Sequence, residues 1–104
     1  MELRPDDRLL VLKPAADLPL TTWAQQVEAG LLVVVAEGET VYELRRALRE
    51  FPNVMVTPAG ADGVIPWRDG FFTVLWAAEP GEAGAEMRRV LQPDGRTFTG
   101  SGGK

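Results

Sequence analysis

Few side chains in this sequence are of the kinds that carry out chemistry. The 104 residues include no cysteine and no histidine, which excludes thiolate nucleophiles and thiolate metal sites and removes the commonest general base. Four carboxylates show no spacing that acid–base catalysis or a metal ion would need: Asp6, Asp7, Glu79 and Glu82. We therefore assign no catalytic residue and no metal ligand.

Two groups of arginines are candidates for binding phosphate: Arg45, Arg46 and Arg49, and then Arg88 and Arg89. Each group shares its expected helix with glutamates, which favours solvated faces with ion pairs inside the helix. The net charge is -4 and the arginines form no continuous stripe. Binding to DNA or RNA is therefore not expected.

Four aromatic residues lie in or beside one apolar run: Trp67, Phe71, Phe72 and Trp76. They are candidates to line a pocket for a planar ligand. Aromatic side chains in and beside a buried strand more often belong to the core, and that interpretation is favoured here.

Short apolar runs predict strands at residues 9–12, 31–35, 54–57 and 72–76, and a last strand is predicted at residues 96–99. The first two runs are continuous, and the second is rich in β-branched residues, as in strands that are buried on both faces of a parallel sheet. We expect them to be central strands, with Val11 and Val34 almost fully buried.

Helical spacing of apolar residues separates these strands. Leu20, Trp23, Ala24 and Val27 form one stripe, and Gly30 supplies a stop. Further helices are predicted at residues 40–50 and 82–91. Two pairs are predicted to form capping boxes, Thr22 with Gln25 and Thr40 with Glu43. Strands alternating with helices predict an α/β fold: a three-layer, Rossmann-like, mainly parallel sheet of about five strands with helices on both faces.

The chain is expected to form a single domain over residues 1–99, followed by a flexible tail at residues 100–104. No run approaches the roughly 18 apolar residues that a membrane span needs, and the first residues lack the basic and apolar regions of a signal peptide. The expected location is the cytoplasm.

Two blocks are specific in order and spacing. Residues 65–75 begin Ile-Pro-Trp-Arg-Asp-Gly and lead into an apolar strand, and residues 86–96 contain a helix ending in Val-Leu, then Pro-Asp-Gly and a new strand. Together with residues 8–12, 32–36 and 51–56, they resemble the core of class I S-adenosylmethionine-dependent methyltransferases of the type 11 kind. The resemblance covers roughly residues 8 to 99.

In that family a glycine-rich loop after the first strand and an acidic residue at the end of the second strand hold the methyl donor. Here the loop positions correspond to Lys13, Ala15 and Asp17, with Pro14 between them. The second strand ends at Ala36, with Glu37 one residue further on. The acidic residue often found in the family's fourth strand corresponds to Thr73.

Glu37 and Asp62 are the two candidate cofactor-binding residues, if a donor binds at all. Asp62 lies near the position where the family often places an acid against the adenine. Glu37 is also explained as an acid near a helix N-terminus, and Asp62 as a turn residue between glycines.

The resemblance thus implies a shortened, degenerate core. The segment after the fourth strand is brief, and the family's final antiparallel strands are missing from the sequence. We expect a non-catalytic interaction or structural protein without a cofactor, partnered by a second copy or by another protein. The alternative is an S-adenosylmethionine-dependent methyltransferase with a divergent donor site.

Overall fold

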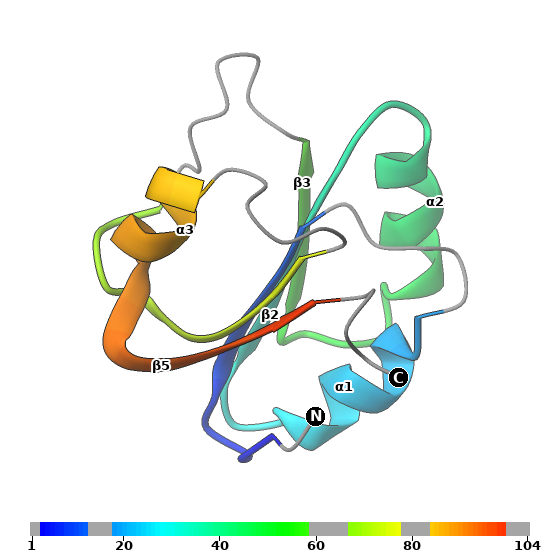
Figure 1. The fold of residues 1–104 in the computed structure, drawn as a ribbon. Helices are drawn as coiled ribbons and strands as arrows, with labels where there is room; N and C mark the ends of the chain where they lie inside the picture. Colours follow the sequence, from blue (N-terminus) through cyan, green and yellow to red (C-terminus); the bar gives the residue numbers. More distant parts are fainter. Residues whose placement is uncertain (1–2, 13–17, 59–66, 78–83, 100–104) are drawn as a thin grey trace.

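Five parallel strands form one sheet in the order β3-β2-β1-β4-β5 (Figure 1). The computed structural model describes residues 3–12, 18–58, 67–77 and 84–99. The strands are β1 (Arg8–Leu12), β2 (Leu31–Ala36), β3 (Val54–Pro58), β4 (Phe72–Ala77) and β5 (Leu91–Thr99). The helices are α1 (Leu20–Gln26), α2 (Thr40–Ala47) and α3 (Gly84–Val90).

The helices lie on both faces of the sheet. Side chains of α1 and α2 pack with one face of the strands, and side chains of α3 pack with the other, so that the sheet separates α3 from α1 and α2 (Figure 1). Because every strand pair is parallel, each connection must cross over a face, as the alternation of strands and helices predicted. The three-layer, Rossmann-like fold is confirmed.

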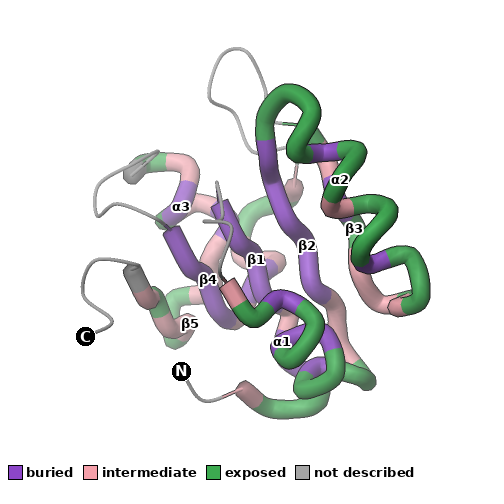
Figure 2. Tube along the Cα trace, turned by 90° about the vertical axis from the view of Figure 1, so that its right-hand side faces the viewer, coloured by how far each residue is buried: buried purple, intermediate pink, exposed green. Residues whose placement is uncertain are grey.

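The core extends along the central strands, which are buried on both faces. Val11 and Val34 are each 0% exposed and pair with each other across β1 and β2. Figure 2 shows the buried residues running along β1, β2 and β4. The continuous apolar runs therefore behave as expected for central parallel strands.

The four aromatic residues do not line a common pocket. Trp76 packs against Trp23 with ring centroids 6.3 Å apart, on the face covered by α1 and α2. Trp67, Phe71 and Phe72 cluster on the face covered by α3. Phe72 and Trp76 are buried, so the core interpretation is confirmed for these two.

Both predicted capping boxes are wrong. No side chain caps α1 or α2. A capping box needs its threonine outside the helix at the cap, but α1 begins at Leu20 and α2 begins at Thr40 itself, so both threonines lie within the first turn. Leu20 is buried against the sheet, and burial of this side chain starts α1 two residues before Thr22.

The C-terminal boundaries also differ from the predicted ones. The second helix ends at Ala47 rather than near residue 50, because Leu48 accepts a turn hydrogen bond from the N–H of Phe51. The third ends at Val90, and Leu91 already pairs with Phe72 in the sheet. The Pro-Asp-Gly turn at residues 93–95 lies inside β5 and interrupts its pairing with β4. Leu91 pairs with Phe72 and Arg96 pairs with Val74, so four residues of β5 lie opposite a single residue of β4.

Asn53 and Arg45 fix the outer strand β3. The Asn53 side-chain amide donates to the carbonyls of Ala24 (3.0 Å) and Val27 (2.9 Å) at the end of α1. The Nε of Arg45 donates to the carbonyl of Val56 at 3.1 Å. Arg45 was expected on a solvated face, and it is exposed, but it also ties α2 to β3.

No helix among the described residues combines the length and the apolar character that a membrane crossing requires.

Gly30 allows β2 to begin against the backbone before β1. The N–H of Leu31 donates to the carbonyl of Asp7 at 3.1 Å. A Cβ added at Gly30 would lie 2.0 Å from that carbonyl oxygen, so the two backbone segments would have to separate. We expect Gly30→Ala to lower the free energy of unfolding by about 3 kcal/mol, the cost of overpacking a tight site, as measured by urea denaturation.

Gly38→Ala is the matched control. Gly38 has a φ of +61° and open space around it, so an alanine there meets only the strain of the left-handed conformation, about 1–2 kcal/mol. Equal losses for the two variants would contradict the close approach at Gly30.

Candidate functional site

The order of the strands points to one end of the sheet. β1 lies between β2 and β4, and successive connections run outward in opposite directions from it. In open parallel sheets, ligands bind outside the carboxyl ends of the strands at the point where the strand order reverses. Here that point lies between the ends of β1 and β4, where Leu12 pairs with Ala77.

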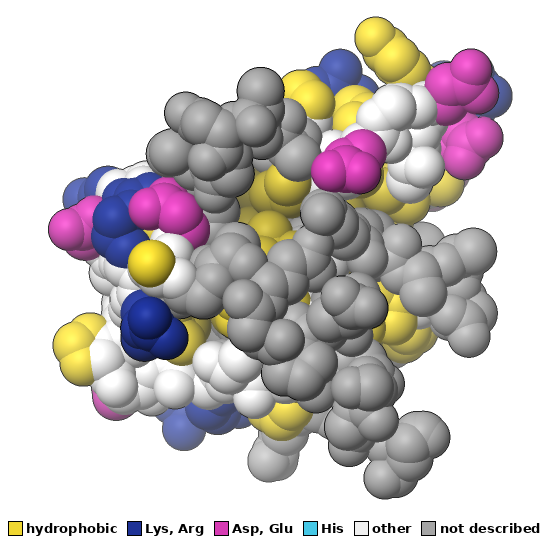
Figure 3. All heavy atoms as spheres, turned by 45° about the horizontal axis from the view of Figure 1, so that its top comes forward, with side chains coloured by type: hydrophobic (Ala, Val, Ile, Leu, Met, Phe, Trp, Pro, Cys, Tyr) yellow, Lys and Arg dark blue, Asp and Glu magenta, His cyan; other side chains and the backbone are white. Residues whose placement is uncertain are grey.

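The described strand ends at this point carry aliphatic side chains. Leu12 is 5% exposed, Ala36 is 1% exposed and Ala77 is 0% exposed. The predicted loop positions Lys13, Pro14, Ala15 and Asp17 and the candidate Asp62 lie outside the described residues, as do the carboxylates Glu79 and Glu82. In Figure 3, which brings this end toward the viewer, acidic side chains gather toward the α2 side and a mixed charged group lies toward α3.

Glu37 is the predicted site residue that the structure places at this end. It follows the last residue of β2, its side chain is exposed, and its carbonyl accepts a hydrogen bond from the N–H of Thr40 at 3.2 Å. Gly38, with a φ of +61°, makes the turn into α2. Glu37 therefore stands both beside the strand ends and at the entry to a helix, where an acid complements the helix dipole.

Thr73 does not lie at the same end of the sheet as Glu37. It lies near the start of β4, and its hydroxyl accepts a hydrogen bond from the N–H of Arg8 at 2.9 Å and donates to Oδ1 of Asp7 at 2.9 Å. Arg8 is the first residue of β1, so this contact is at the amino ends of the strands. The family position that corresponds to Thr73 thus serves a polar cluster at the opposite end of the sheet.

Asp7 is the centre of that cluster, which we call the Asp7 cluster: Asp7, Thr73 and Arg96 with the backbone of Arg4. Asp7 is 4% exposed. Its Oδ2 accepts hydrogen bonds from the N–H of Arg4 at 2.7 Å and from Nη2 of Arg96 at 2.6 Å. The carboxylate therefore joins the segment before β1 to both β4 and β5.

The pKa of Asp7 lies below its ordinary value of 3.8. Burial alone would raise this pKa, but the hydrogen bonds from Arg4, Thr73 and Arg96, and the positive charge of Arg96, outweigh it. A polar cavity of about 240 Å³ opens beside the cluster, and its lining includes Arg4, Asp94 and Arg96. Because Asp7 is already fully engaged, its arrangement is that of a structural ion pair.

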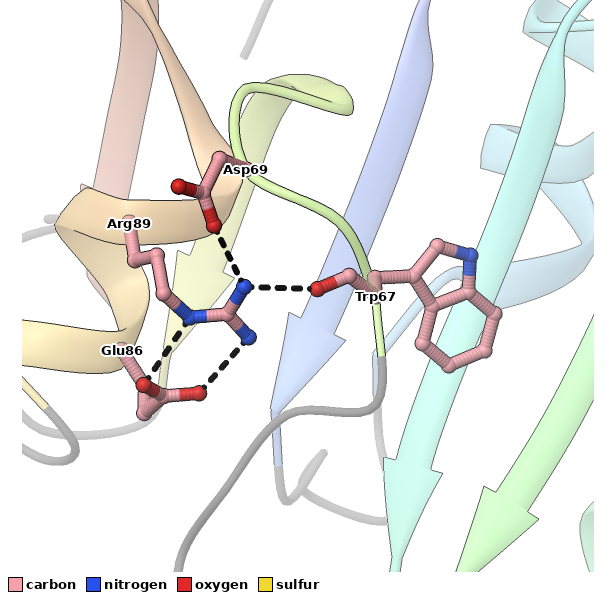
Figure 4. Close-up of polar contacts among 4 residues, drawn as sticks. All are labelled: Trp67, Asp69, Glu86 and Arg89. Atoms are coloured by element: carbon pink, nitrogen blue, oxygen red, sulfur yellow. Dashed lines mark hydrogen bonds and ion pairs between the residues drawn. The ribbon is translucent and has the colours of Figure 1, made fainter.

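Arg89 forms a second polar centre, which fastens α3 to the segment before β4 (Figure 4). Its guanidinium makes two hydrogen bonds with Glu86, at 3.0 and 2.8 Å, and an ion pair with Asp69 at 2.7 Å. It also donates to the carbonyl of Trp67 at 2.8 Å. These contacts raise the pKa of Arg89 above its ordinary value, with the Glu86 hydrogen bonds as the largest cause.

Sequence reasoning anticipated only part of this arrangement. The Arg89–Glu86 pair has the i,i+3 spacing that ion pairs on a helix share, and it is confirmed. The contacts of Asp7 with Thr73 and Arg96 join residues 66 and 89 positions apart. No local pattern predicts such pairs, so the sequence gives no signal for the structural role of Asp7.

Several solved structures are similar to this chain. A SAM-dependent methyltransferase from Aquifex aeolicus matches with a TM-score of 0.76 at 20% identity, over 88% of this chain and 54% of that one. The YcgJ protein from Bacillus subtilis matches with a TM-score of 0.76 at 22% identity, over 93% and 45%. This chain has the core fold of class I S-adenosylmethionine-dependent methyltransferases.

A further similar chain comes from the complex between the Haloferax volcanii Trm112 methyltransferase activator and a methyltransferase. It matches with a TM-score of 0.75 at 17% identity, over 95% of this chain and 46% of that one. This chain spans about half the length of these solved structures. No protein-family model and no curated protein matches its sequence. The methyltransferase-like fold predicted from residues 65–75 and 86–96 is confirmed.

The Asp7 cluster should govern the acid stability of this methyltransferase-like fold. Because the pKa of Asp7 is lower in the folded state than its ordinary 3.8, ionised Asp7 stabilises the fold above about pH 4. This contribution is lost as the pH falls through the folded-state pKa. We expect Asp7→Asn to be less stable at neutral pH and to lose less stability on acidification, as measured by urea unfolding at a series of pH values.

Asp6→Asn is the matched control, since Asp6 directly precedes Asp7 and its carboxylate is exposed. Its curve of stability against pH should run parallel to that of the wild type. If the Asp7→Asn curve also runs parallel, the carboxylate does not contribute through its charge.

Proposed function

We propose that this chain is a non-catalytic methyltransferase-like protein with a degenerate donor site, acting as an interaction or structural protein. One observation carries the proposal: β1, β2 and β4 end in the buried aliphatic residues Leu12, Ala36 and Ala77 at the place where ligands bind in sheets of this kind. The proposal keeps the fold as a single domain over residues 1–99.

The polar chemistry of the methyl donor fits poorly with these buried aliphatic strand ends. S-adenosylmethionine has an amino-acid group with both charges, a sulfonium and two ribose hydroxyls. A polar group buried without a hydrogen-bond partner costs about 1–3 kcal/mol, and an unpaired charge costs more. Aliphatic strand ends offer no side-chain partner, and Glu37, the first charged residue after β2, is exposed.

The alternative function is an S-adenosylmethionine-dependent methyltransferase with a divergent donor site. The likeness to a SAM-dependent methyltransferase favours it, and so does the position of Glu37 directly after β2. Glu37 would then hold the ribose hydroxyls and Asp62 would lie against the adenine. S-adenosylmethionine would be the cofactor, and no metal ion would be needed.

A ligand titration separates the two functions. Under the proposed function, S-adenosylhomocysteine leaves the melting temperature of the protein unchanged and gives no saturable heat in calorimetry. If a donor site is present, S-adenosylhomocysteine at 100 times its dissociation constant would stabilise the fold by about 2.7 kcal/mol. In a protein of this size that stabilisation gives a clear rise in melting temperature. A dissociation constant below about 100 micromolar, or roughly 5.5 kcal/mol of binding free energy, would overturn the proposal.

A second test compares the stability and the ligand binding of Glu37→Ala with those of the control variant Glu39→Ala. Both glutamates are exposed, and both precede α2. Under the proposed function each substitution changes stability by no more than about 0.3–1 kcal/mol, the contribution of an acid near a helix N-terminus. If the alternative holds, Glu37→Ala alone weakens the binding of S-adenosylhomocysteine.

The interaction surface that we propose is the outer edge of β5, with a second copy of this chain as its partner. β5 is an outer strand of the sheet, and an uncovered edge is a template for strand pairing. At the other edge, Arg45 donates to the carbonyl of Val56. Within the described part of the chain, no side chain donates to the backbone of Thr97 or Phe98 in this way. One similar fold was solved in complex with another protein, a Trm112 activator.

Light scattering at micromolar concentration tests this homodimer. We expect a mass near twice the 11.3 kDa of one chain, because two-fold pairing of identical edges closes the assembly. Thr97→Lys adds a charge to an exposed position of β5, and Phe98→Asp adds one beside it. Both should reduce the mass toward that of the monomer, with circular dichroism confirming that the variants fold.

Met55→Lys is the matched control, because Met55 is 48% exposed on the opposite edge strand, β3. It should leave the mass unchanged. A mass near 11.3 kDa for the wild type, or a dimer lost only in Met55→Lys, would reject the β5 interface.

A further inference from the structure

The polar cavity beside the Asp7 cluster is lined by two irregular segments of the chain. Residues of the turn at 4–7 line one side, residues of β5 between 92 and 96 line another, and Thr73 of β4 also contributes. Its volume is about 240 Å³. A single water needs roughly 10–15 Å³ of space, whereas pockets for drug-sized ligands measure about 300–1,000 Å³. The cavity therefore suits a molecule of only a few heavy atoms.

The interrupted pairing of β5 with β4 shapes one side of this cavity. Residues 92–95 lie opposite Thr73 alone, because Leu91 pairs with Phe72 and Arg96 pairs with Val74. Interruptions of this kind are frequent next to active sites, where they redirect side chains. A Cβ added at Gly95 would lie 2.6 Å from Cγ of Leu91, so this stretch of β5 is closely packed.

Both sides of the cavity are joined by the Asp7 carboxylate. The N–H of Asp7 donates to the carbonyl of Arg4 at 3.0 Å, and the N–H of Arg4 donates to Oδ2 of Asp7 at 2.7 Å. The same oxygen accepts a hydrogen bond from Nη2 of Arg96 at 2.6 Å. The cavity is therefore formed before a ligand arrives, and binding avoids the cost of ordering its walls.

Carboxylates outnumber guanidinium groups among the residues that line the cavity. Asp7 and Arg96 compensate each other's charge. The other ionised residues of the lining are Asp6, Asp94 and Arg4. Among the described residues, neither Asp6 nor Asp94 takes part in an ion pair. A positively charged group in the cavity would offset this excess of negative charge.

The lining residues favour an organic cation over a metal ion. The described residues include no group of three or more His, Cys, Asp or Glu that could hold a metal. A primary ammonium group needs only acceptors, because it donates three hydrogen bonds and accepts none. The lining includes Asp6, Asp94 and Gln92, whose carboxylate and amide oxygens are acceptors. Hydrogen bonds from an ammonium to a carboxylate are among the stronger ones in proteins.

We propose that this cavity binds a small molecule through a primary ammonium group, with Asp6 and Asp94 as its acceptors. The site lies at the opposite end of the sheet from the expected donor site, and it does not depend on the proposed function. The shared chemistry is the ammonium group, which either a simple amine or a free amino acid supplies. In the second case Arg4, which also lines the cavity, binds the carboxylate of the amino acid.

Titration of the whole protein with ethylamine tests the site, at neutral pH and constant ionic strength with amide chemical shifts as the readout. We expect saturable shifts at residues 4–7 and 92–96. Tetramethylammonium, which has the same charge but no N–H donor, should give no saturation. Asp94→Asn should weaken ethylamine binding by about tenfold, which corresponds to about 1.4 kcal/mol.

Glu39→Gln is the matched control, because it removes an exposed acid that precedes α2. It should leave the affinity for ethylamine unchanged. Ethylamine shifts that do not saturate, equal shifts with tetramethylammonium, or equal affinity in Asp94→Asn would overturn the proposal.

Gly95→Ala tests whether the interruption of β5 shapes the site. The added Cβ would displace this stretch from Leu91, so the variant should bind ethylamine more weakly while circular dichroism shows that it is folded. Unchanged affinity would overturn the assignment of the site to this side of the cavity.

The amino acid glycine, titrated in parallel, identifies the source of the ammonium group. Tighter binding than ethylamine, with the difference lost in Arg4→Gln, indicates a free amino acid. Equal or weaker binding indicates a simple amine.

Discussion

The burial of β1 on both faces is the constraint on which the rest of this structure depends. Residues Arg8–Leu12 pair with β2 on one side, and Leu9–Leu12 pair with β4 on the other. With apolar layers above and below, no polar side chain can lie along the middle of the strand without a buried partner. Polar chemistry is therefore confined to the two ends of the sheet, and the two ends differ sharply.

At the carboxyl ends, β1, β2 and β4 finish in Leu12, Ala36 and Ala77. At the amino ends, Asp7 joins the segment before β1 to Thr73 of β4 and Arg96 of β5. Sheets of this kind place their ligands at the carboxyl ends, whereas the buried charged residue of the described part of the chain, Asp7, lies at the other end. A carboxylate that accepts three hydrogen bonds and is 4% exposed ties the segment before β1 to β4 and β5.

How far the sequence predicts this structure depends on the range of each interaction. The strands follow from continuous apolar runs, because burial on both faces needs no knowledge of the partner, and Val11 and Val34 are buried as predicted. The capping boxes failed because Leu20 gains more by packing on the sheet than Thr22 gains by capping. Leu91 was assigned to a helix because its strand partner, Phe72, is 19 residues earlier in the chain.

The candidate site was less predictable than the fold, for the same reason. Glu37 could be placed after β2 from the strand pattern alone, but Asp62 lies outside the described residues. The role of Asp7 depends on Arg96, which approaches only after β4 and β5 have paired. Asp6 and Asp94 are likewise far apart in the sequence, and only the closed sheet brings both to one cavity.

The anchoring of β5 bears on how this fold would bind a partner. Arg96 is tied to Asp7 at the amino end of the sheet, and residues from Arg96 to Thr99 pair with β4 along the inner edge. The strand is therefore ordered before any partner arrives. Binding that requires a segment to become ordered loses part of its interaction energy to that ordering, whereas a preformed strand avoids this cost. An edge held in this way can pair with a second copy through its backbone. The side-chain contact that fixes it comes from Asp7, before β1, and no side chain of the described residues donates to the backbone of Thr97 or Phe98.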